Sequence, residues 1–258
     1  MVYYSVVTHA PCSSPHPGQR ADIQSLPTLA ALAAVTVLRN PVRASSTADG
    51  IPDDVLVPDV ALACGEAAAC GILDAVHQRW VHDPTPASVA ADAAGITSSV
   101  VTTGLWSYVT DDGRHGGVWG VGTDGLVMRR DVFDLRAVAA AAGSATGVTD
   151  SELAMEAQHD VPAWALVEDL PATVAAADLT AVAGWQRGGG VLGGVIVVGG
   201  AGVAAIFVAS DAAGVNGVWF PSATGVTTTL RGVTAFNAAE ACVPVWLVVC
   251  CVTQRVKL

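Results

Sequence analysis

The chain is poor in positive charge and in charged residues of either sign. Lys257 is its one lysine, the 258 residues include 12 Lys+Arg against 23 Asp+Glu, and charged residues make up 14% of the chain. Nucleic-acid binding needs clustered cations that displace counterions, so the net charge of -11 makes nucleic acid an unsuitable partner. Because 52% of the residues are hydrophobic, the composition also excludes global disorder, and the length permits a sizeable core.

Metal-binding and secretory cysteine patterns are missing. The six cysteines contain no C-x-x-C pair, and no cationic region precedes the apolar residues at the N-terminus, as a secretory signal requires. These features predict reduced, mostly buried thiols in a cytoplasmic protein with no metal. The cysteines are Cys12, Cys64, Cys70, Cys242, Cys250 and Cys251.

Motifs for catalysis or for a cofactor are also lacking. The sequence has no G-x-S-x-G motif of a serine hydrolase. Residues 120–125 match G-x-G-x-x-G, but the β-rich Leu126-Val127-Met128 follows where a dinucleotide site needs a helix, so we predict a hairpin turn there. We therefore expect no cofactor and no enzymatic activity. The alternative is a small, hydrolase-like enzyme whose site is assembled from scattered residues.

One uncharged stretch is long enough to cross a membrane as a helix. Residues 191–210 are mostly apolar, but five of the twenty are glycine and Gly199-Gly200-Ala201-Gly202 lies at the centre. Two β-branched runs flank this glycine cluster, which favours a buried β-hairpin. A membrane-associated protein anchored by residues 191–210 is the second alternative, whereas our main expectation is no membrane contact.

The order of patterns along the chain predicts an α+β fold. An antiparallel meander is indicated at 98–130 by alternating β-rich runs with Asp-Gly corners, and a second strand region is indicated at 191–233. Alanine-rich and Pro-bounded segments predict helices before, between and after these regions. Runs of strands separated by runs of helices indicate an α+β fold. The predicted helices are 26–38, 59–80, 86–94, 133–142, 151–160, 162–183 and 235–250.

A weak internal repeat supports two related parts. Gly117-Val118-Trp119 recurs one hundred residues later as Gly217-Val218-Trp219. We therefore predict two pseudo-symmetric halves, each an antiparallel β-sheet packed with helices. The predicted divisions are a flexible N-terminal leader at 1–25, an N-terminal α+β half at 26–145 and a C-terminal α+β half at 146–258.

Trp219 and Phe220 are the strongest candidates for a binding surface. Adjacent strand residues face opposite sides, so one of the two aromatic side chains leaves the main core unless another layer covers it. An exposed aromatic residue is a good interface anchor. The alternative is that both side chains belong to the core.

Several motifs lie in a recognisable order along the chain: Pro41, the long predicted helix ending near Trp80, Gly117-Val118-Trp119, Gly125-Leu126-Val127, Asp211 with Gly217-Val218-Trp219, and the closing helix. In this layout the sequence resembles the EspG family, the cytosolic chaperones of actinobacterial type VII secretion. The resemblance spans roughly residues 26–250 and implies the α+β fold with two pseudo-symmetric halves. It implies a chaperone or adaptor that binds PE–PPE-type secretion substrates, keeps them soluble and has no catalytic activity.

We accordingly expect a monomer or homodimer that binds a PE–PPE-type protein. The predicted protein-binding residues are Trp185, Arg187, Asn216, Trp219 and Phe220.

Overall fold

A computed structural model describes most of the apolar, β-rich part of the chain. The predicted leader at 1–25, the predicted helix at 151–160 and most of those at 86–94 and 133–142 lie outside the described residues. The described residues are 32–38, 60–74, 79–83, 85–87, 99–111, 113, 115–135, 162–211, 216–237, 240–245 and 248–252.

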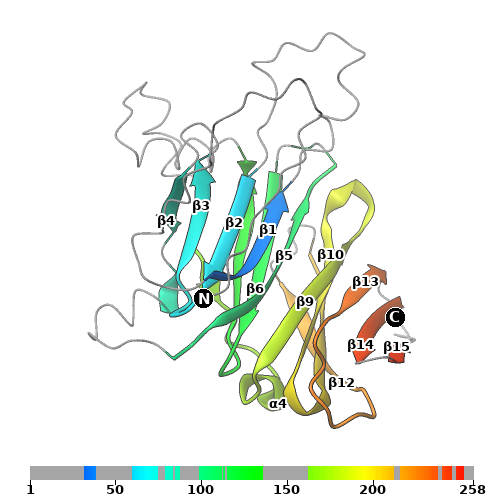
Figure 1. The fold of residues 1–258 in the computed structure, drawn as a ribbon. Helices are drawn as coiled ribbons and strands as arrows, with labels where there is room; N and C mark the ends of the chain where they lie inside the picture. The colour runs from blue at the N-terminus through cyan, green and yellow to red at the C-terminus, as the bar shows by residue number, and fades with distance from the viewer. Residues whose placement is uncertain are drawn as a thin grey trace, which may run out of the picture.

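In the part of the chain that the structure describes, four antiparallel sheets follow one another, and within each sheet the strands pair in sequence order (Figure 1). Sheet 1 contains β1 (Leu32–Leu38), β2 (Val60–Gly65), β3 (Cys70–Asp74) and β4 (Arg79–Asp83). Sheet 2 contains β5 (Thr102–Val109), β6 (His115–Gly122), β7 (Val127–Asp134) and β8 (Ala165–Leu166). Sheet 3 follows the short helix α4 (Ala172–Ala175) and contains β9 (Leu179–Gln186), β10 (Leu192–Gly199), β11 (Val203–Ala209) and β12 (Gly217–Ala223). Sheet 4 contains β13 (Thr234–Asn237), β14 (Glu240–Val245) and β15 (Val248–Val252).

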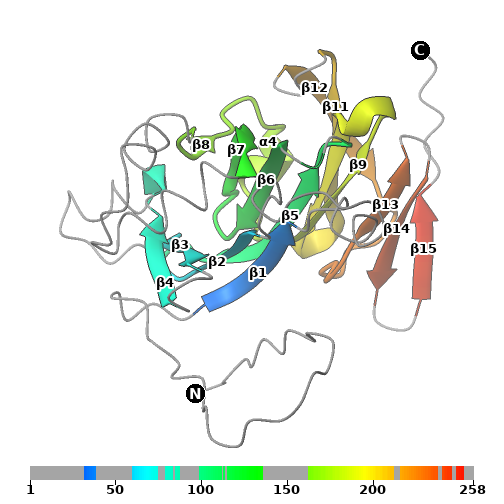
Figure 2. The same cartoon turned by 90° about the horizontal axis from the view of Figure 1, so that it is seen from above.

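The sheets are arranged as a fan. The first strand of each sheet contacts the first strand of the next, through β1 and β5, β5 and β9, and β9 and β13. Figure 2 shows these strands gathered together while the later strands of each sheet spread outwards. Radial repetition of four-stranded antiparallel sheets is the architecture of β-propellers, so the described residues have a propeller-like arrangement.

The prediction of an α+β fold with two pseudo-symmetric halves is wrong. The regular structure of the described residues is almost entirely antiparallel strand, α4 is four residues long, and sheets recur four times along the chain. The repeated Gly-Val-Trp triplets also occupy different positions, since Gly117-Val118-Trp119 lies in β6 inside sheet 2 whereas Gly217-Val218-Trp219 lies in β12 at the edge of sheet 3.

The long helix predicted at 59–80 is instead strands β2 and β3 and the start of β4. Alanine has the highest intrinsic helix propensity, but pairing with β1 and β3 overrides that weak preference. Val60, Leu62 and Cys64 alternate onto the core face and are at most 1% exposed. The turn between β2 and β3 contains Ala67 and Ala68 at positive φ. Alanine seldom adopts this conformation, so the composition of the segment does not signal a turn.

Three further helix predictions fail in the same way. The 26–38 segment contains strand β1, the 162–183 segment contains β8, the short α4 and the start of β9, and the 235–250 segment contains β13, β14 and part of β15. The 133–142 prediction begins inside β7, which ends at Asp134. In each case the segment forms strands that pair with the next or preceding strand in the sequence. The hydrogen bonds of that pairing satisfy the backbone N–H and C=O groups as well as those of a helix would.

The hairpin predicted at 191–210 is confirmed. Strands β10 and β11 pair in register, with Ile196 opposite Ile206, and every residue of β10 is buried. The glycine cluster forms the turn, where Gly202 has a φ of 71° and a Cβ would collide with the carbonyl of Val226. The anchoring helix considered for this segment is therefore wrong. Within the described part of the chain, no helix has the length and apolarity needed to cross a membrane.

The meander predicted at 98–130 is also confirmed as β5, β6 and β7. Its second corner is the G-x-G-x-x-G match, where Asp124 and Gly125 have φ values of 55° and 67°. The Gly122 amide donates to the Leu126 carbonyl at 2.9 Å, which closes a hairpin turn as predicted.

The inner strands of the fan are held together by close backbone approach and by hydroxyl groups. Gly104 in β5 lies against β9, where a Cβ would come within 3.2 Å of the Ala181 Cα. Thr103 Oγ1 donates to the Leu179 carbonyl at 2.6 Å, and the hydroxyls of Thr36 and Ser107 join β1 to β5 at 2.6 Å. These contacts satisfy polar groups where successive sheets meet.

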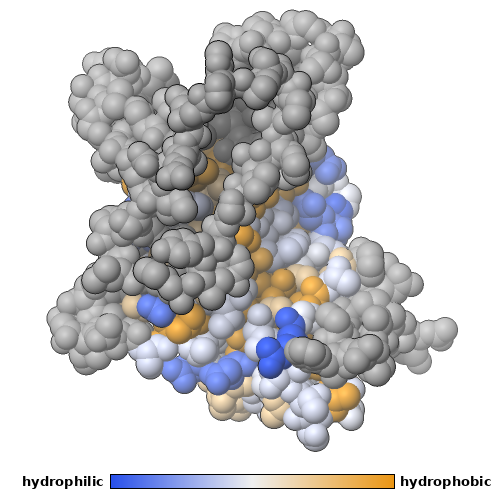
Figure 3. Space-filling model, viewed as in Figure 1, coloured by the Kyte–Doolittle hydropathy of each residue, from blue (hydrophilic) through white to orange (hydrophobic). Residues whose placement is uncertain are grey.

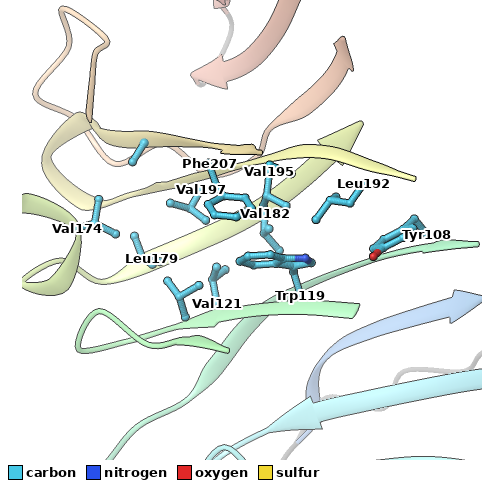
Figure 4. Close-up of a cluster of buried hydrophobic side chains, with 13 residues drawn as sticks. Tyr108, Trp119, Val121, Val174, Leu179, Val182, Leu192, Val195, Val197 and Phe207 are labelled. Atoms are coloured by element: carbon cyan, nitrogen blue, oxygen red, sulfur yellow. The ribbon is translucent and has the colours of Figure 1, made fainter. Parts of the chain in front are cut away.

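A separate apolar core fills each space between successive sheets. The core between sheets 1 and 2 includes Leu62, Ile72, Val118 and Met128. The core between sheets 2 and 3 is centred on Trp119 and Phe207, and Figure 4 shows Trp119 projecting from β6 toward the side chains of sheet 3. The third core, on the opposite face of sheet 3, packs against β13 and the segment before it and includes Trp185, Ile196, Ile206, Leu230 and Ala235.

A disulfide joins Cys64 to Cys70, so the expectation of reduced thiols is wrong for this pair. The two residues lie directly opposite one another on β2 and β3, with their Cα atoms 4.1 Å apart. They are six positions apart in the sequence, and spacing alone could not show that a hairpin would bring them face to face.

Removing this disulfide is expected to lower the free energy of unfolding by about 2 kcal/mol, because the unfolded chain regains the entropy of a small closed loop. The measurement is urea unfolding of the wild type and of the double variant Cys64→Ala/Cys70→Ala, each with and without reductant. Reductant should destabilise the wild type more than the variant. An equal effect on both proteins would show that the Cys64–Cys70 bond does not stabilise the fold.

Candidate functional site

The candidate site is built on β12, the outer strand of sheet 3. As predicted from strand alternation, its two adjacent aromatic residues face opposite sides. Trp219 is half-buried, and its ring centroid lies 5.3 Å from that of Phe207 and 6.3 Å from that of Trp119. Phe220 is 41% exposed, and Val218 on the same side of the strand is 55% exposed. Trp219 thus fixes the strand to the core while Phe220 and Val218 remain open to solvent.

Arg187 and Asn216 lie at the end of the sheet where β12 begins. The Arg187 guanidinium donates from Nη2 to the Ala209 carbonyl at 2.6 Å and to the Asp211 carbonyl at 3.3 Å. Asn216 donates from its backbone amide and from Nδ2 to Asp211 Oδ2, at 3.0 and 2.7 Å. Both predicted residues therefore converge on Asp211 and position the entry to β12.

Trp185 occupies a different environment. It is 7% exposed and belongs to the core on the opposite face of sheet 3 from Trp219. Its ring lies over Gly193 and Gly194, where a Cβ would meet ring atoms at 2.5 Å in the first case. The structure therefore brings together Arg187, Asn216, Trp219 and Phe220 at one end and edge of sheet 3, and it places Trp185 in the interior.

An open depression of about 390 Å³ adjoins β12. One wall is β12 itself, and the other is the segment that follows β8. The sequence predicts a helix over 162–183, so it gives no indication of a binding site in this segment. Pro171 is the sequence feature that could have indicated this wall. Proline is common at the start of a helix, so it marks the point where the irregular segment ends and α4 begins. The lining residues are Asp169, Leu170, Pro171, Gly217, Val218, Trp219 and Pro221.

The outer edge of β12 lacks one backbone N–H donor, because residue 221 of this strand is proline. The Ser210 amide donates to the Asn216 carbonyl at 2.8 Å. Alternation from that bond directs the amides of residues 218, 220 and 222 toward β11. Pro221 therefore occupies a position whose amide would point away from β11, and it has none to offer. Proline at such a position blunts pairing with a further strand, so the side chains of β12 are a better contact surface than its backbone.

Exposed apolar side chains also occur away from this site. Val35 and Val37 in β1 are 50% and 38% exposed. Figure 3 shows apolar side chains gathered over the middle of the face on which β1 lies in Figure 1. Among the residues that the structure describes, no group of three or more His, Cys, Asp or Glu side chains could hold a metal ion.

Among the residues that the structure describes, Tyr108 is the one whose pKa is clearly raised above its ordinary value. Burial, and to a smaller extent the charge of Asp131, raise its pKa from 10.0 to about 12, whereas Arg129 opposes the shift. Tyr108 is 6% exposed and stacks on Trp106 with ring centroids 5.5 Å apart.

This burial predicts a loss of stability in alkali. Because the folded-state pKa lies above the unfolded value, the contribution is complete below pH 10 and is lost as the pH rises toward 12. Between pH 9 and pH 11 the free energy of unfolding should fall by about 1 kcal/mol more in the wild type than in Tyr108→Phe. Urea unfolding of both proteins at the two pH values measures the difference, and parallel curves would mean that Tyr108 does not resist ionisation.

Neither the protein-family models nor the curated protein sequences contain a match to this chain.

Proposed function

We propose that the chain is a protein-binding module whose contact surface is the β12 surface, formed by the exposed side chains of Val218 and Phe220 on one face of that strand. The observation that carries the proposal is the exposure of Val218 and Phe220, at 55% and 41%, on the same face of one strand. Large apolar side chains exposed together on a rigid strand are typical of interaction sites, and an aromatic residue is a strong anchor.

The construction of β12 supports this role. Trp219 packs against Phe207 and Trp119, so the strand that presents Phe220 is held by a buried aromatic cluster. Arg187 and Asn216 hold the start of the same strand through Asp211. A surface fixed in this way loses little conformational entropy on binding.

The narrower proposal is a cytosolic chaperone or adaptor that binds PE–PPE-type secretion substrates through this surface. An exposed apolar strand in an acidic protein suits the masking of an apolar partner surface. The described residues do not have the α+β fold that the family resemblance implied, so this proposal now depends on the surface and not on the fold. The Cys64–Cys70 disulfide weighs against its cytosolic part, because cytosolic thiols are kept reduced.

The test is co-expression with a PE–PPE pair followed by size-exclusion chromatography. Co-elution of the wild type would support the narrower proposal, and separate elution would count against it. Val218→Glu/Phe220→Glu should weaken binding at least about tenfold, because both charges enter the apolar contact. Val35→Glu is the matched control, since Val35 is similarly exposed but lies on β1. Equal loss in both variants would show that the contact is not made by the β12 surface.

A further inference from the structure

The depression beside β12 lies on the face of that strand that carries Trp219 and Pro221, opposite the β12 surface. Across it, the segment after β8 contributes Leu170, Pro171 and the acidic Asp169. Trp219 is half-buried and Asp169 is exposed. The depression therefore combines an indole ring, apolar walls and a negatively charged residue.

A tryptophan and an aspartate already hold an arginine next to Trp219. The Arg129 guanidinium carbon lies 5.8 Å from the ring centroid of Trp119, and Arg129 Nε is 3.1 Å from Asp131 Oδ1. The Trp119 ring is in turn an edge-on neighbour of Trp219, with 6.3 Å between the two ring centroids. Asp131 balances the charge of Arg129, so the charge of Asp169 is left without a cation.

The same combination of side chains occurs in the core between sheets 1 and 2. There the Arg130 guanidinium carbon is 5.1 Å from the Trp164 ring centroid, and Asp83 forms an ion pair with the same guanidinium. Arginine suits such a site, since its planar cation stacks on an aromatic ring while its N–H groups bind a carboxylate. In both examples the arginine belongs to the chain itself.

The depression supplies the tryptophan and the aspartate of this combination without the arginine. Trp219 and Asp169 both line it, and the described lining residues include no lysine or arginine. Within the described part of the chain, Asp169 forms no ion pair. An arginine that enters from another molecule would therefore meet an indole ring and an uncompensated carboxylate, with Leu170 and Pro171 against its methylene groups.

The shape of the depression favours an arginine carried by a peptide segment over a free small cation. Small-molecule sites enclose most of the ligand surface, whereas this depression is open and has two walls. A ligand held there needs further contacts outside the depression, and a peptide segment can make them. The net charge of -11 also attracts basic segments over longer distances.

We propose that the depression binds an arginine side chain of a partner protein, with the guanidinium stacked on Trp219 and hydrogen-bonded to Asp169. This site is separate from the β12 surface, because Trp219 and Phe220 face opposite sides of the strand. The proposal therefore does not depend on the function proposed above, and each of the two can fail while the other stands.

The experiment is a titration of the full chain with N-acetylarginine amide, followed by proton–nitrogen correlation NMR. The readout is the indole N–H signal of Trp219, which is assigned by its absence from Trp219→Phe. The probe should shift this signal in a saturable way. N-acetylcitrulline amide has nearly the same shape without the charge, and it should bind at least about fivefold more weakly. No shift, or equal affinity for the neutral probe, would overturn the proposal.

Two neighbouring acidic residues provide matched variants. Asp169→Asn should weaken binding of N-acetylarginine amide about fivefold, because it removes the carboxylate charge beside the guanidinium. Glu168→Gln removes the same net charge one residue away, but Glu168 does not line the depression, so this variant should bind like the wild type. Equal weakening in both variants would show that only the overall charge attracts the probe and would refute a site at Asp169.

A longer probe tests the source of the arginine. A pentapeptide with a central arginine between two leucines should bind at least about tenfold more tightly than N-acetylarginine amide, because the leucines bury additional apolar surface. Equal affinities would overturn the assignment to a peptide segment. Analytical ultracentrifugation covers the remaining source. Self-association of the wild type that is lost in Asp169→Asn would mean that a second copy of the chain supplies the arginine, and it would overturn the assignment to a partner protein.

Discussion

Replacing Asp83 with asparagine is expected to lower the free energy of unfolding by about 3–5 kcal/mol. Asp83 ends β4 and Arg130 lies in β7, and the two residues are 6% and 3% exposed. The Arg130 Nη2 donates to Asp83 Oδ1 at 2.5 Å, and Trp164 Nε1 donates to Asp83 Oδ2 at 2.8 Å. Asparagine removes the carboxylate charge that faces the buried guanidinium in the core between sheets 1 and 2.

The neighbouring residue pair provides the matched control. Arg129 and Asp131 in the same strand are ion-paired at 3.1 Å, but their side chains are 19% and 38% exposed. Asp131→Asn should therefore reduce stability by less than about 1 kcal/mol, because solvent screens an exposed pair. Urea unfolding followed by far-UV circular dichroism compares the two variants. Equal losses of stability in the two variants would mean that the buried ion pair of Asp83 contributes no more to folding than the exposed pair of Asp131.

Replacing Trp119 with alanine is expected to lower the free energy of unfolding by about 3–5 kcal/mol. Trp119 is 2% exposed in the core between sheets 2 and 3, with its ring centroid 5.3 Å from that of Phe207. The Arg129 guanidinium carbon lies 5.8 Å from the same ring centroid. Truncation removes the one fully buried tryptophan among the described residues of this core and leaves a cavity that β6 and β11, both fixed by strand pairing, cannot close.

An aromatic residue outside the cores serves as the comparison. Phe220→Ala should change stability by no more than about 0.5 kcal/mol, as is usual for surface substitutions. The reason is that Phe220 is 41% exposed. Far-UV circular dichroism is the suitable probe, since removing a tryptophan alters the fluorescence signal. A small effect for Trp119→Ala would contradict the assignment of the aromatic cluster as the contact that joins sheets 2 and 3.

Local sequence determined the parts of this protein in which neighbouring strands meet through short turns. The meander of β5 to β7 was predictable because Asp-Gly and Gly-rich corners separate β-branched runs, and the β10–β11 hairpin was predictable because glycine interrupts an apolar stretch. The opposite orientations of Trp219 and Phe220 followed from the two-residue period of a strand. None of these conclusions needs information about residues far away in the chain.

Tertiary structure alone decided the rest, because long-range pairing competes with local preference. The alanine-rich residues of β2 and β3 have high helix propensity, and only pairing with β1 and β4 holds them extended. Which of Trp219 and Phe220 is buried depends on Trp119, one hundred residues away in another sheet. The Asp83–Arg130 pair and the Cys64–Cys70 disulfide likewise depend on how strands align. Strand register is set by the packing of whole sheet faces, and no local pattern specifies which faces will meet.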